Sequence, residues 1–152
     1  MRLLQQTLLT VFHQLNNQNI GLETITPPSK HSCQVSFEFG IAEESAFNFL
    51  DKEELQRARK SIVEKALSTL DVFCATRFHT VNEGGKRKPL KFDYHLLRFT
   101  FYKKNIELLI SHERGTQRIP LEDLVTFFTN RVNKELATKQ QRQLALKYLH
   151  AL

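Results

Sequence analysis

A cluster of basic residues lies near the middle of the sequence, where two glycines and a proline interrupt the apolar pattern. Residues 84–91 contain four positive charges with no acidic residue between them, namely Lys86, Arg87, Lys88 and Lys91. Segment 84–118 contains nine basic and three acidic residues, so its net charge equals the +6 of the whole 152-residue chain. Clustered Lys and Arg bind nucleic-acid phosphates because binding releases condensed counterions. We therefore expect a nucleic acid, RNA or DNA, as the partner, with this loop making the main contact.

The other basic residues of segment 84–118 extend the predicted nucleic-acid site along the adjoining strands. They are Arg98, Lys103, Lys104, Arg114 and Arg118. An open sheet face with Phe, Tyr and Arg could also stack unpaired bases. We instead expect Phe99 and Phe101 in the core and binding by charge, while Tyr94 and Tyr102 stay open to either role. The alternative function is a protein-interaction subunit of a larger assembly, whose basic surface meets an acidic partner.

Histidine and acidic residues recur in the same region and could in principle bind a metal. They are His79, Asp93, His95, His112 and Glu113. Imidazole and carboxylate ligands suit Zn²⁺ or Mn²⁺, but the sequence has no dense ligand motif such as H-E-x-x-H or C-x-x-C. It also has no nucleophile-elbow or phosphate-loop motif, and Asp93 is the only acid within the central strand. We expect a non-enzymatic protein with no catalytic residue, no metal and no cofactor.

Cys33 and Cys74 lie in separate apolar runs that are typical of strands. Arg2 precedes an apolar segment that Gln5 and Gln6 interrupt, so the sequence lacks the unbroken apolar run of a signal peptide. No window approaches the ~20 apolar residues that span a bilayer. These patterns predict two buried free thiols in a reducing compartment, a cytoplasmic (intracellular) location and no membrane partner. A disulfide would require the two strands to be neighbours with the correct geometry.

The first half of the chain predicts two helices and two strands. Helical spacing of apolar residues covers 2–16, and strands are expected at 20–25 and 33–39. Phe47, Phe49 and Leu50 are expected to cover the edge of the core. A helix begins at Asp51, where the D-x-x-E pattern with Glu54 resembles a capping box. On its exposed side Glu53 and Arg57 are spaced to pair at i,i+4.

The second half predicts three strands, at about 72–79, 90–102 and 106–110, joined by short connections. The strand at 90–102 changes its apolar parity: Leu90, Phe92, Tyr94 and Leu96 are expected to be buried in its first half, and Leu97, Phe99 and Phe101 in its second half. A bulge near residues 95–97 would reconcile the two halves, because one extra residue reverses the facing of all that follow. The alternative is a strand that is buried on both faces.

Two helices complete the chain, one beginning near Pro120 and one from about Thr138 to His150. The predicted order is α-β-β-α-β-β-β-α-α, an α+β fold in which helices pack on one face of an antiparallel sheet. We expect a single globular domain over residues 1–152, with an α-β-β-β-α core at 51–137 and a C-terminal helix at 138–152. This last helix either packs on its own core or binds a protein partner.

The element order predicted for residues 51–137 is similar to that of double-stranded RNA-binding domains. The resemblance is one of topology alone, and topology does not establish function. Those domains place lysines at the start of their second helix, whereas this sequence has Glu122 and Asp123 there. Acidic residues at that position would repel the phosphates of a duplex.

Overall fold

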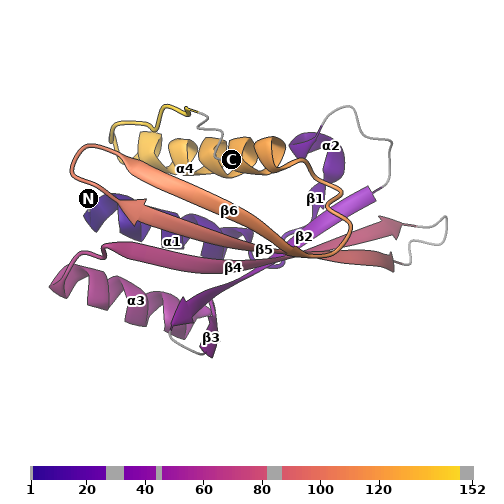
Figure 1. Cartoon of the computed structure of the whole chain (residues 1–152), viewed down its shortest axis with the longest axis horizontal. Helices are drawn as coiled ribbons and strands as arrows, with labels where there is room; N and C mark the ends of the chain where they lie inside the picture. The colour runs from indigo at the N-terminus through magenta and orange to yellow at the C-terminus, as the bar shows by residue number, and fades with distance from the viewer. Residues whose placement is uncertain (1, 27–32, 44–45, 82–86, 148–152) are drawn as a thin grey trace.

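The computed structural model describes residues 2–26, 33–43, 46–81 and 87–147, and for 81 and 87–91 it describes the backbone alone. Figure 1 shows the arrangement. The elements in chain order are α1 (Arg2–Leu15), β1 (Ile20–Gly21), α2 (Leu22–Ile25), β2 (Cys33–Glu43), β3 (Ala46–Phe49), α3 (Lys52–Glu64), β4 (Thr69–Val81), β5 (Arg87–Phe101), β6 (Ile106–Arg114) and α4 (Leu121–Thr138).

The strands form a six-stranded sheet in the order β1-β2-β4-β5-β6, and β3 pairs with the same edge of β2 as β1 does. Every pairing between strands is antiparallel. Strands β4, β5 and β6 follow one another as the predicted meander, because short connections favour antiparallel neighbours. The expected α+β fold with an antiparallel sheet is therefore confirmed.

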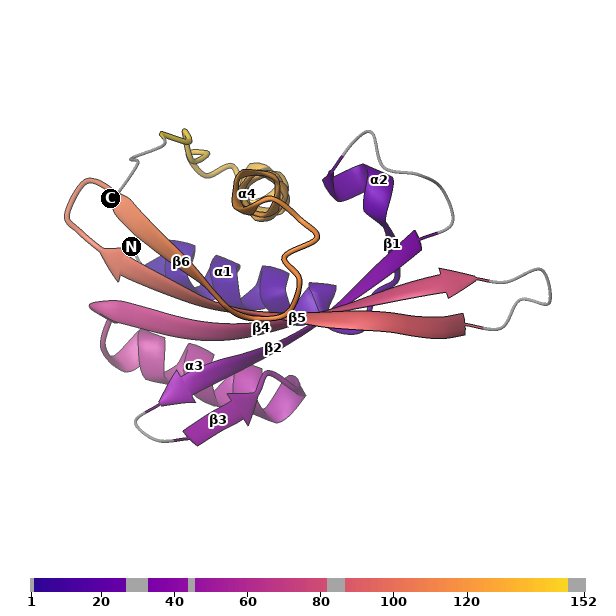
Figure 2. The same ribbon diagram turned by 45° about the vertical axis from the view of Figure 1, so that its right-hand side comes forward.

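The helices pack on one face of this sheet around a core rich in phenylalanine. Helix α1 contributes Phe12, whose ring lies 4.7 Å from that of Phe39 on β2 and 5.6 Å from that of Phe128 on α4. Val35 and Phe37 on β2 are also fully buried on this face, as expected for a strand whose alternate residues face the core. In Figures 1 and 2 strands β4 and β5 pass in front of α1, so the face toward the viewer is the one that α1 leaves uncovered.

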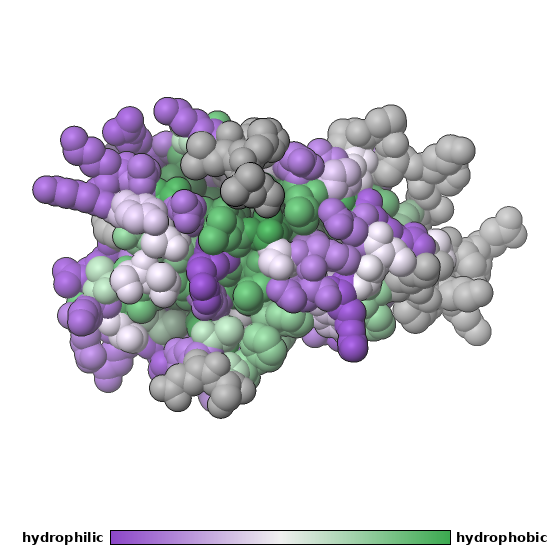
Figure 3. All heavy atoms as spheres, viewed as in Figure 1, coloured by the Kyte–Doolittle hydropathy of each residue, from purple (hydrophilic) through white to green (hydrophobic). Residues whose placement is uncertain are grey.

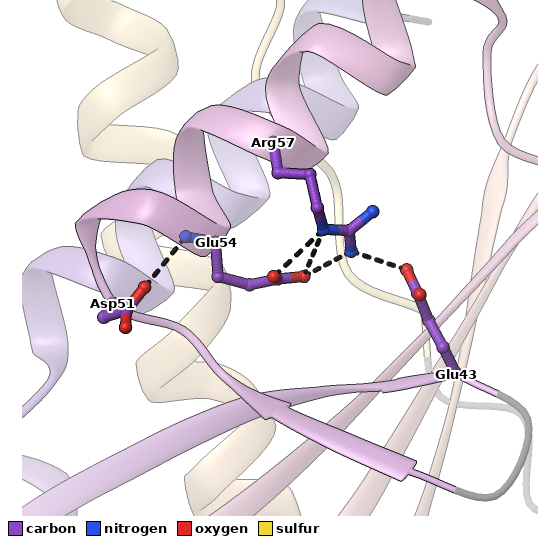
Figure 4. Close-up of polar contacts among 4 residues, drawn as sticks. All are labelled: Glu43, Asp51, Glu54 and Arg57. Atoms are coloured by element: carbon purple, nitrogen blue, oxygen red, sulfur yellow. Dashed lines mark hydrogen bonds and ion pairs between the residues drawn. The ribbon is translucent and has the colours of Figure 1, made fainter.

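Helix α3 begins where the sequence predicts, and it also fixes the end of β2. The Asp51 side chain accepts a 2.8 Å hydrogen bond from the backbone N–H of Glu54. The predicted pairing of Arg57 with Glu53 is wrong: Arg57 donates instead to Glu54 and, at 2.7 Å, to Glu43 at the end of β2 (Figure 4). Hydrogen bonds to Glu54 and then to Glu43 raise the pKa of Arg57, which keeps its charge in this contact. Arg57 thus ties α3 to the strand end that leads into β3.

The C-terminal part differs from the expected second helix. Helix α4 ends at Thr138, and residues 141–147 are not helical. Asn133 holds this segment on α4, because its amide donates to the Leu144 carbonyl at 3.0 Å and accepts from the Leu144 N–H at 2.6 Å. Leu144 packs against the core, so this part of the segment covers the protein's own apolar surface.

The two cysteines are free thiols, as predicted; Cys74 is buried as expected, whereas Cys33, also expected to be buried, is half-buried. Burial raises the pKa of the Cys74 thiol to about 12, so that it stays protonated. Among the described residues, no helix has both the length and the apolar character needed to cross a bilayer.

Candidate nucleic-acid interface

In the first half of strand β5 polar side chains are buried and aromatic ones are not, which is the reverse of the predicted pattern. Asp93 and His95 lie opposite Thr76 and Cys74 of β4 and are 1% exposed on the helix-covered face. Phe92 and Tyr94 consequently point to the other face, where Phe92 is 43% exposed. The expectation that Leu90, Phe92, Tyr94 and Leu96 form a buried face is therefore wrong for Phe92, which is exposed, and for Tyr94 and Leu96, which are only half-buried; the side chain of Leu90 lies outside the described part.

The predicted change of parity within β5 does not occur. From Asp93 to Phe99 the odd-numbered residues face the helices without interruption, and Phe99 is buried as expected, while Phe101 is half-buried at the core edge. One irregular pairing adjoins the predicted site, at Tyr94/His95 in the β5–β6 ladder, but its extra residue is Glu113 on β6. The other lies between Phe78 and His79 in the β4–β5 ladder, opposite Leu90. Strand β5 thus presents one continuous open face beside β4.

Four aromatic side chains lie in a row on this open face, contributed by three strands. The ring centroids of Phe47 on β3 and Phe73 on β4 are 4.7 Å apart, and those of Phe73 and Tyr94 on β5 are 5.5 Å apart. Tyr94 and Phe92 follow at 6.2 Å with nearly parallel rings, 8° between their planes. We call Phe47, Phe73, Tyr94 and Phe92 the aromatic row. Its two ends are the most exposed members, Phe47 at 59% and Phe92 at 43%.

Small residues and an arginine shape the surroundings of the aromatic row. Ala75 lies opposite Tyr94, and Gly40 lies opposite both Phe73 and Phe49, so no bulky side chain separates the rings. The Arg77 guanidinium carbon lies 5.5 Å from the centre of the Phe92 ring, in the range of a cation–π contact. Figure 3 shows hydrophobic side chains across the middle of this side of the molecule, with hydrophilic ones around them.

Sequence reasoning missed Phe47 as a site residue and placed it at the edge of the core. Leu50 is indeed fully buried, but Phe47 and Phe49 are exposed, because pairing with Ala42 and Gly40 puts both rings on the open face. One signal was available in the sequence: Phe73 alternates with Val72 and Cys74, so it points to the opposite face of the sheet.

The nine predicted basic residues are not gathered in one place. Lys86 lies outside the described residues, and Arg87, Lys88 and Lys91 are described only as backbone of β5, at the end that begins opposite Val81 of β4. Lys103 and Lys104 are exposed in the turn at the other end of β5. Strand β5 has 15 residues, so at about 3.4 Å per residue its two ends are up to about 50 Å apart along the strand.

The remaining three predicted residues have different surroundings. Arg98 is on the open face, where it donates to Asp71 at 2.8 and 3.0 Å and is thereby neutralised. Arg114 is exposed at the end of β6, opposite Tyr94. Arg118 lies beyond β6, with its guanidinium carbon 5.6 Å from the ring centre of the buried Phe78. Only Arg98 and Arg114 of the nine have described side chains close to the open face of β5.

Asp93 determines which face of the sheet each side chain of β5 points to, because it forms hydrogen bonds with the β6–α4 connection. Its carboxylate accepts hydrogen bonds from the backbone N–H groups of Gln117 at 2.8 Å and Arg118 at 3.0 Å. Gly115 has φ +107°, and a Cβ there would lie 2.2 Å from the Asp93 carboxylate. Burial opposes ionisation, but the two N–H donors and His112 outweigh it and lower the pKa of Asp93. Asp93 is thus a positioning residue that turns Phe92 and Tyr94 outward.

Three of the five candidate metal ligands come together behind the aromatic row, on the helix-covered face. The His112 Nε2 lies 3.4 Å from the Asp93 carboxylate, and the His95 and His112 ring centres are 5.1 Å apart. Neither ring nitrogen of His95 has a hydrogen-bond partner among the described residues. Burial, and next the proximity of His112, lower the pKa of His95, so that the ring is neutral.

The other two candidate ligands lie apart from this group. His79 is on the open face, 3.2 Å from the Ser36 hydroxyl, and Glu113 accepts from Ser111 at the exposed end of β6. Within the part of the chain that the structure describes, no three His, Cys, Asp or Glu residues are arranged to hold a metal ion.

Fold and site together define an α+β protein in which one sheet face is covered by helices and the other displays an aromatic row. Comparison with protein-family models, with curated proteins and with solved structures finds no match to this chain. The functional argument therefore rests on the chemistry of the open face.

Proposed function

We propose that this protein is a non-enzymatic module that binds single-stranded nucleic acid on the open face of its sheet. The observation that carries the proposal is the aromatic row, whose rings are held in contact on a face that the described helices leave uncovered. Exposing Phe47 and Phe92 forgoes the stability that their burial would give. Aromatic side chains on an open sheet are a common platform for unpaired bases, and each stacked base contributes ~1–3 kcal/mol.

The charge pattern favours single strands over duplexes. Arg77 pairs with Glu38 at 2.6 Å, and Arg98 pairs with Asp71, so the area around the rings is close to neutral. A duplex offers its phosphates to such a surface, and these would gain little there. A single strand can instead turn its bases toward the rings. The first turn of helix α4 likewise lacks basic residues that would bind a duplex, because Glu122 and Asp123 occupy it.

The basic hairpin, by which we mean the segment 84–91 between β4 and the main part of β5, supplies the electrostatic part of the proposal. Phe92, at one end of the aromatic row, directly follows the segment that contains Arg87, Lys88 and Lys91. In Figures 1 and 2 the described ends of β4 and β5 extend beyond the rest of the sheet at this point. A strand whose bases stack on Phe92 would therefore bring its backbone near these lysines and arginines, where phosphate binding releases counterions.

Fluorescence anisotropy with a labelled oligonucleotide tests the proposal. Phe47→Ala and Phe92→Ala should each weaken binding of a single strand by about 5- to 150-fold, the equivalent of ~1–3 kcal/mol. Tyr102→Ala is the matched control, since Tyr102 is 49% exposed but lies in the β5–β6 turn outside the aromatic row. Equal binding by all three variants and the unaltered protein, or a preference for a duplex of the same sequence, would refute the stacking platform.

A protein partner is the second candidate, and the near-neutral character of the open face is the observation that favours it. Leu109 on β6 is 50% exposed on the same face as Phe92 and Arg98, which adds apolar area of the kind found at interfaces. Affinity capture from native lysate, with and without nuclease, separates the two. Nucleic acid that nuclease removes supports the first candidate, and a stoichiometric protein that survives nuclease supports the second.

A further inference from the structure

Strand β6 forms one edge of the sheet, and its outer side is a row of free backbone groups. Figures 1 and 2 show no strand beyond it, and the strand order ends there. The N–H of Tyr102 donates to the carbonyl of Asn105 at 2.9 Å, which makes these two a hydrogen-bonded pair. Because such pairs alternate along an antiparallel ladder, the N–H and C=O groups of Ile106, Leu108, Ile110 and His112 point away from β5. They have no backbone partner among the described residues.

The side chains along this edge are also only partly covered. Ile106, Leu108 and Ile110 pack against the core from the helix side but remain half-buried. On the open face Leu109 is 50% exposed. From 106 to 112 the edge contains neither a lysine nor a proline, the residues that usually protect an edge strand from pairing. The edge is thus long and apolar on its helix side, and on the open face Leu109 is apolar between Glu107 and Ser111.

We propose that β6 pairs with β6 of a second copy of this chain, in antiparallel register about a twofold axis through Leu109. This register places Leu109 opposite Leu109 of the second copy, Leu108 opposite Ile110 and Ile106 opposite His112. The outward-pointing backbone groups of the two strands then meet one another, as an antiparallel ladder requires. Side chains that share a face stay on that face, so the two open faces become continuous.

Charge selects this register over its neighbours. A shift by two residues in one direction puts Glu107 opposite Glu113, and like charges directly opposite each other are destabilising. The shift in the other direction leaves Glu107 opposite Leu109. In the proposed register Glu107 meets Ser111, and Glu113 meets Asn105 beside the exposed Lys103 and Lys104 of the second copy. The acid at one end of each β6 thereby approaches the basic turn of the other copy, twice by symmetry.

Light scattering after size exclusion tests the proposal on the full chain. The protein should have twice the mass of one chain at high concentration, and Leu109→Lys should halve that mass because it sets two lysines against each other at the axis. Val63→Lys, at a 62% exposed position on α3, is the control and should leave the dimer intact. A mixture of Leu109→Lys with Leu109→Glu should restore the dimer. A monomeric unaltered protein would overturn the proposal, as would a dimer that persists in Leu109→Lys.

Cysteine cross-linking tests the register. Leu109 at the axis forms a non-hydrogen-bonded pair, with Cα atoms ~4.5 Å apart, which lies within the range that a disulfide bridges. Mild oxidation should therefore link Leu109→Cys into covalent dimers, while Ser111→Cys, which faces Glu107 of the second copy, and the unaltered protein stay unlinked. Cross-linking of Ser111→Cys in place of Leu109→Cys would exclude the proposed register. Neither experiment involves nucleic acid, so the outcome is independent of the proposed function.

Discussion

Asp93 and Gly115 show how two residues far apart in sequence decide what a strand displays. The carboxylate accepts two N–H groups from the β6–α4 connection, and Gly115 lets that connection pass within contact distance of it. Alternation alone then places Phe92 and Tyr94 on the outer face. The exposed aromatics are thus a consequence of a buried polar contact on the other side of the same strand.

Gly115→Ala should therefore be strongly destabilising. A side chain at φ +107° costs about 1–3 kcal/mol in backbone conformation, and the new Cβ would collide with the Phe92 carbonyl at 2.3 Å as well as with Asp93. Urea denaturation measures the loss. Gly40→Ala is the control, since its Cβ would approach Asn48 no closer than 3.3 Å and its φ needs no glycine. Similar losses at both glycines would contradict this account.

His95 should make the protein less stable as pH falls below about 7. Its pKa in the folded protein lies below the ordinary value of ~6.5, so below that pH the unfolded chain binds a proton that the folded protein resists. The free energy of unfolding should then fall as pH decreases, by up to ~1.4 kcal/mol per pH unit for one proton. Asp93, with its lowered pKa, contributes only below about pH 4, where stability is lost as pH falls.

Urea denaturation at pH 7.5, 6.5 and 5.5 tests this expectation. His95→Phe removes the group while keeping a ring of similar size, and it should flatten the decline between pH 6.5 and 5.5. The control is His13→Gln, a half-buried position on α1. If His95→Phe loses as much stability as the unaltered protein on acidification, the buried ring is not the source of the pH dependence.

At the scale of elements, Arg57 joins α3 to the end of β2 and thereby supports β3 and Phe47 (Figure 4). Its side chain is 47% exposed, so Arg57→Ala should cost stability by only ~0–1 kcal/mol. It should nevertheless weaken single-strand binding, because the short β3 would hold Phe47 less firmly. In a Phe47→Ala background the same change should have no further effect on binding. Additive losses would show that Arg57 acts by another route, such as direct contact with phosphate.

Sequence patterns predict those elements whose signals are local. The Asp51 cap, the stripe Leu55, Ala58 and Ile62 on α3, and the β4–β6 meander all follow from neighbouring residues. Which face the side chains of β5 point to does not follow from neighbouring residues, because Asp93 is held by residues 24 and 25 positions away. Counting the apolar residues over 90–96 favours burying Phe92. That Asp93 is buried instead becomes apparent only when the N–H groups that donate to it are known. The predicted helix at 138–150 fails for a similar reason, since Asn133 and Leu144 hold residues 141–147 in a non-helical path.

The candidate site is predictable in part for the same reason. Charge clustering is a property of composition, so the basic segment 84–118 is evident from sequence. Whether its members share a surface depends on strand length and facing, and β5 separates Lys88 from Lys103 and Lys104. Asp71 is the neutralising partner of Arg98, and it lies opposite Arg98 only once β4 and β5 are in register.

At the scale of the whole molecule, the hairpin should account for most of the salt dependence of binding. Arg77 and Arg98 already have carboxylate partners, so exchanging these for phosphates should release few counterions. Changing Lys86, Arg87 and Lys88 together to Ala should reduce the slope of log affinity against log salt by about 0.7 per lost single-strand phosphate contact. Arg77→Ala should barely alter that slope. An unchanged slope in the triple variant would exclude the hairpin as the electrostatic contact.

The contact between Asp93 and the turn at Gly115 also indicates how distant relatives of this protein could be recognised. Surface positions can diverge freely, whereas an aspartate flanked by two aromatic residues in a strand needs a glycine about one hairpin later. A search for that spaced pattern, aromatic-Asp-aromatic-His followed by Gly after the return strand, uses a physical constraint in place of overall similarity. Sequences that keep both the aspartate and the glycine should keep aromatic residues on the outer face of the strand. Sequences that lose the glycine should lose the buried aspartate as well.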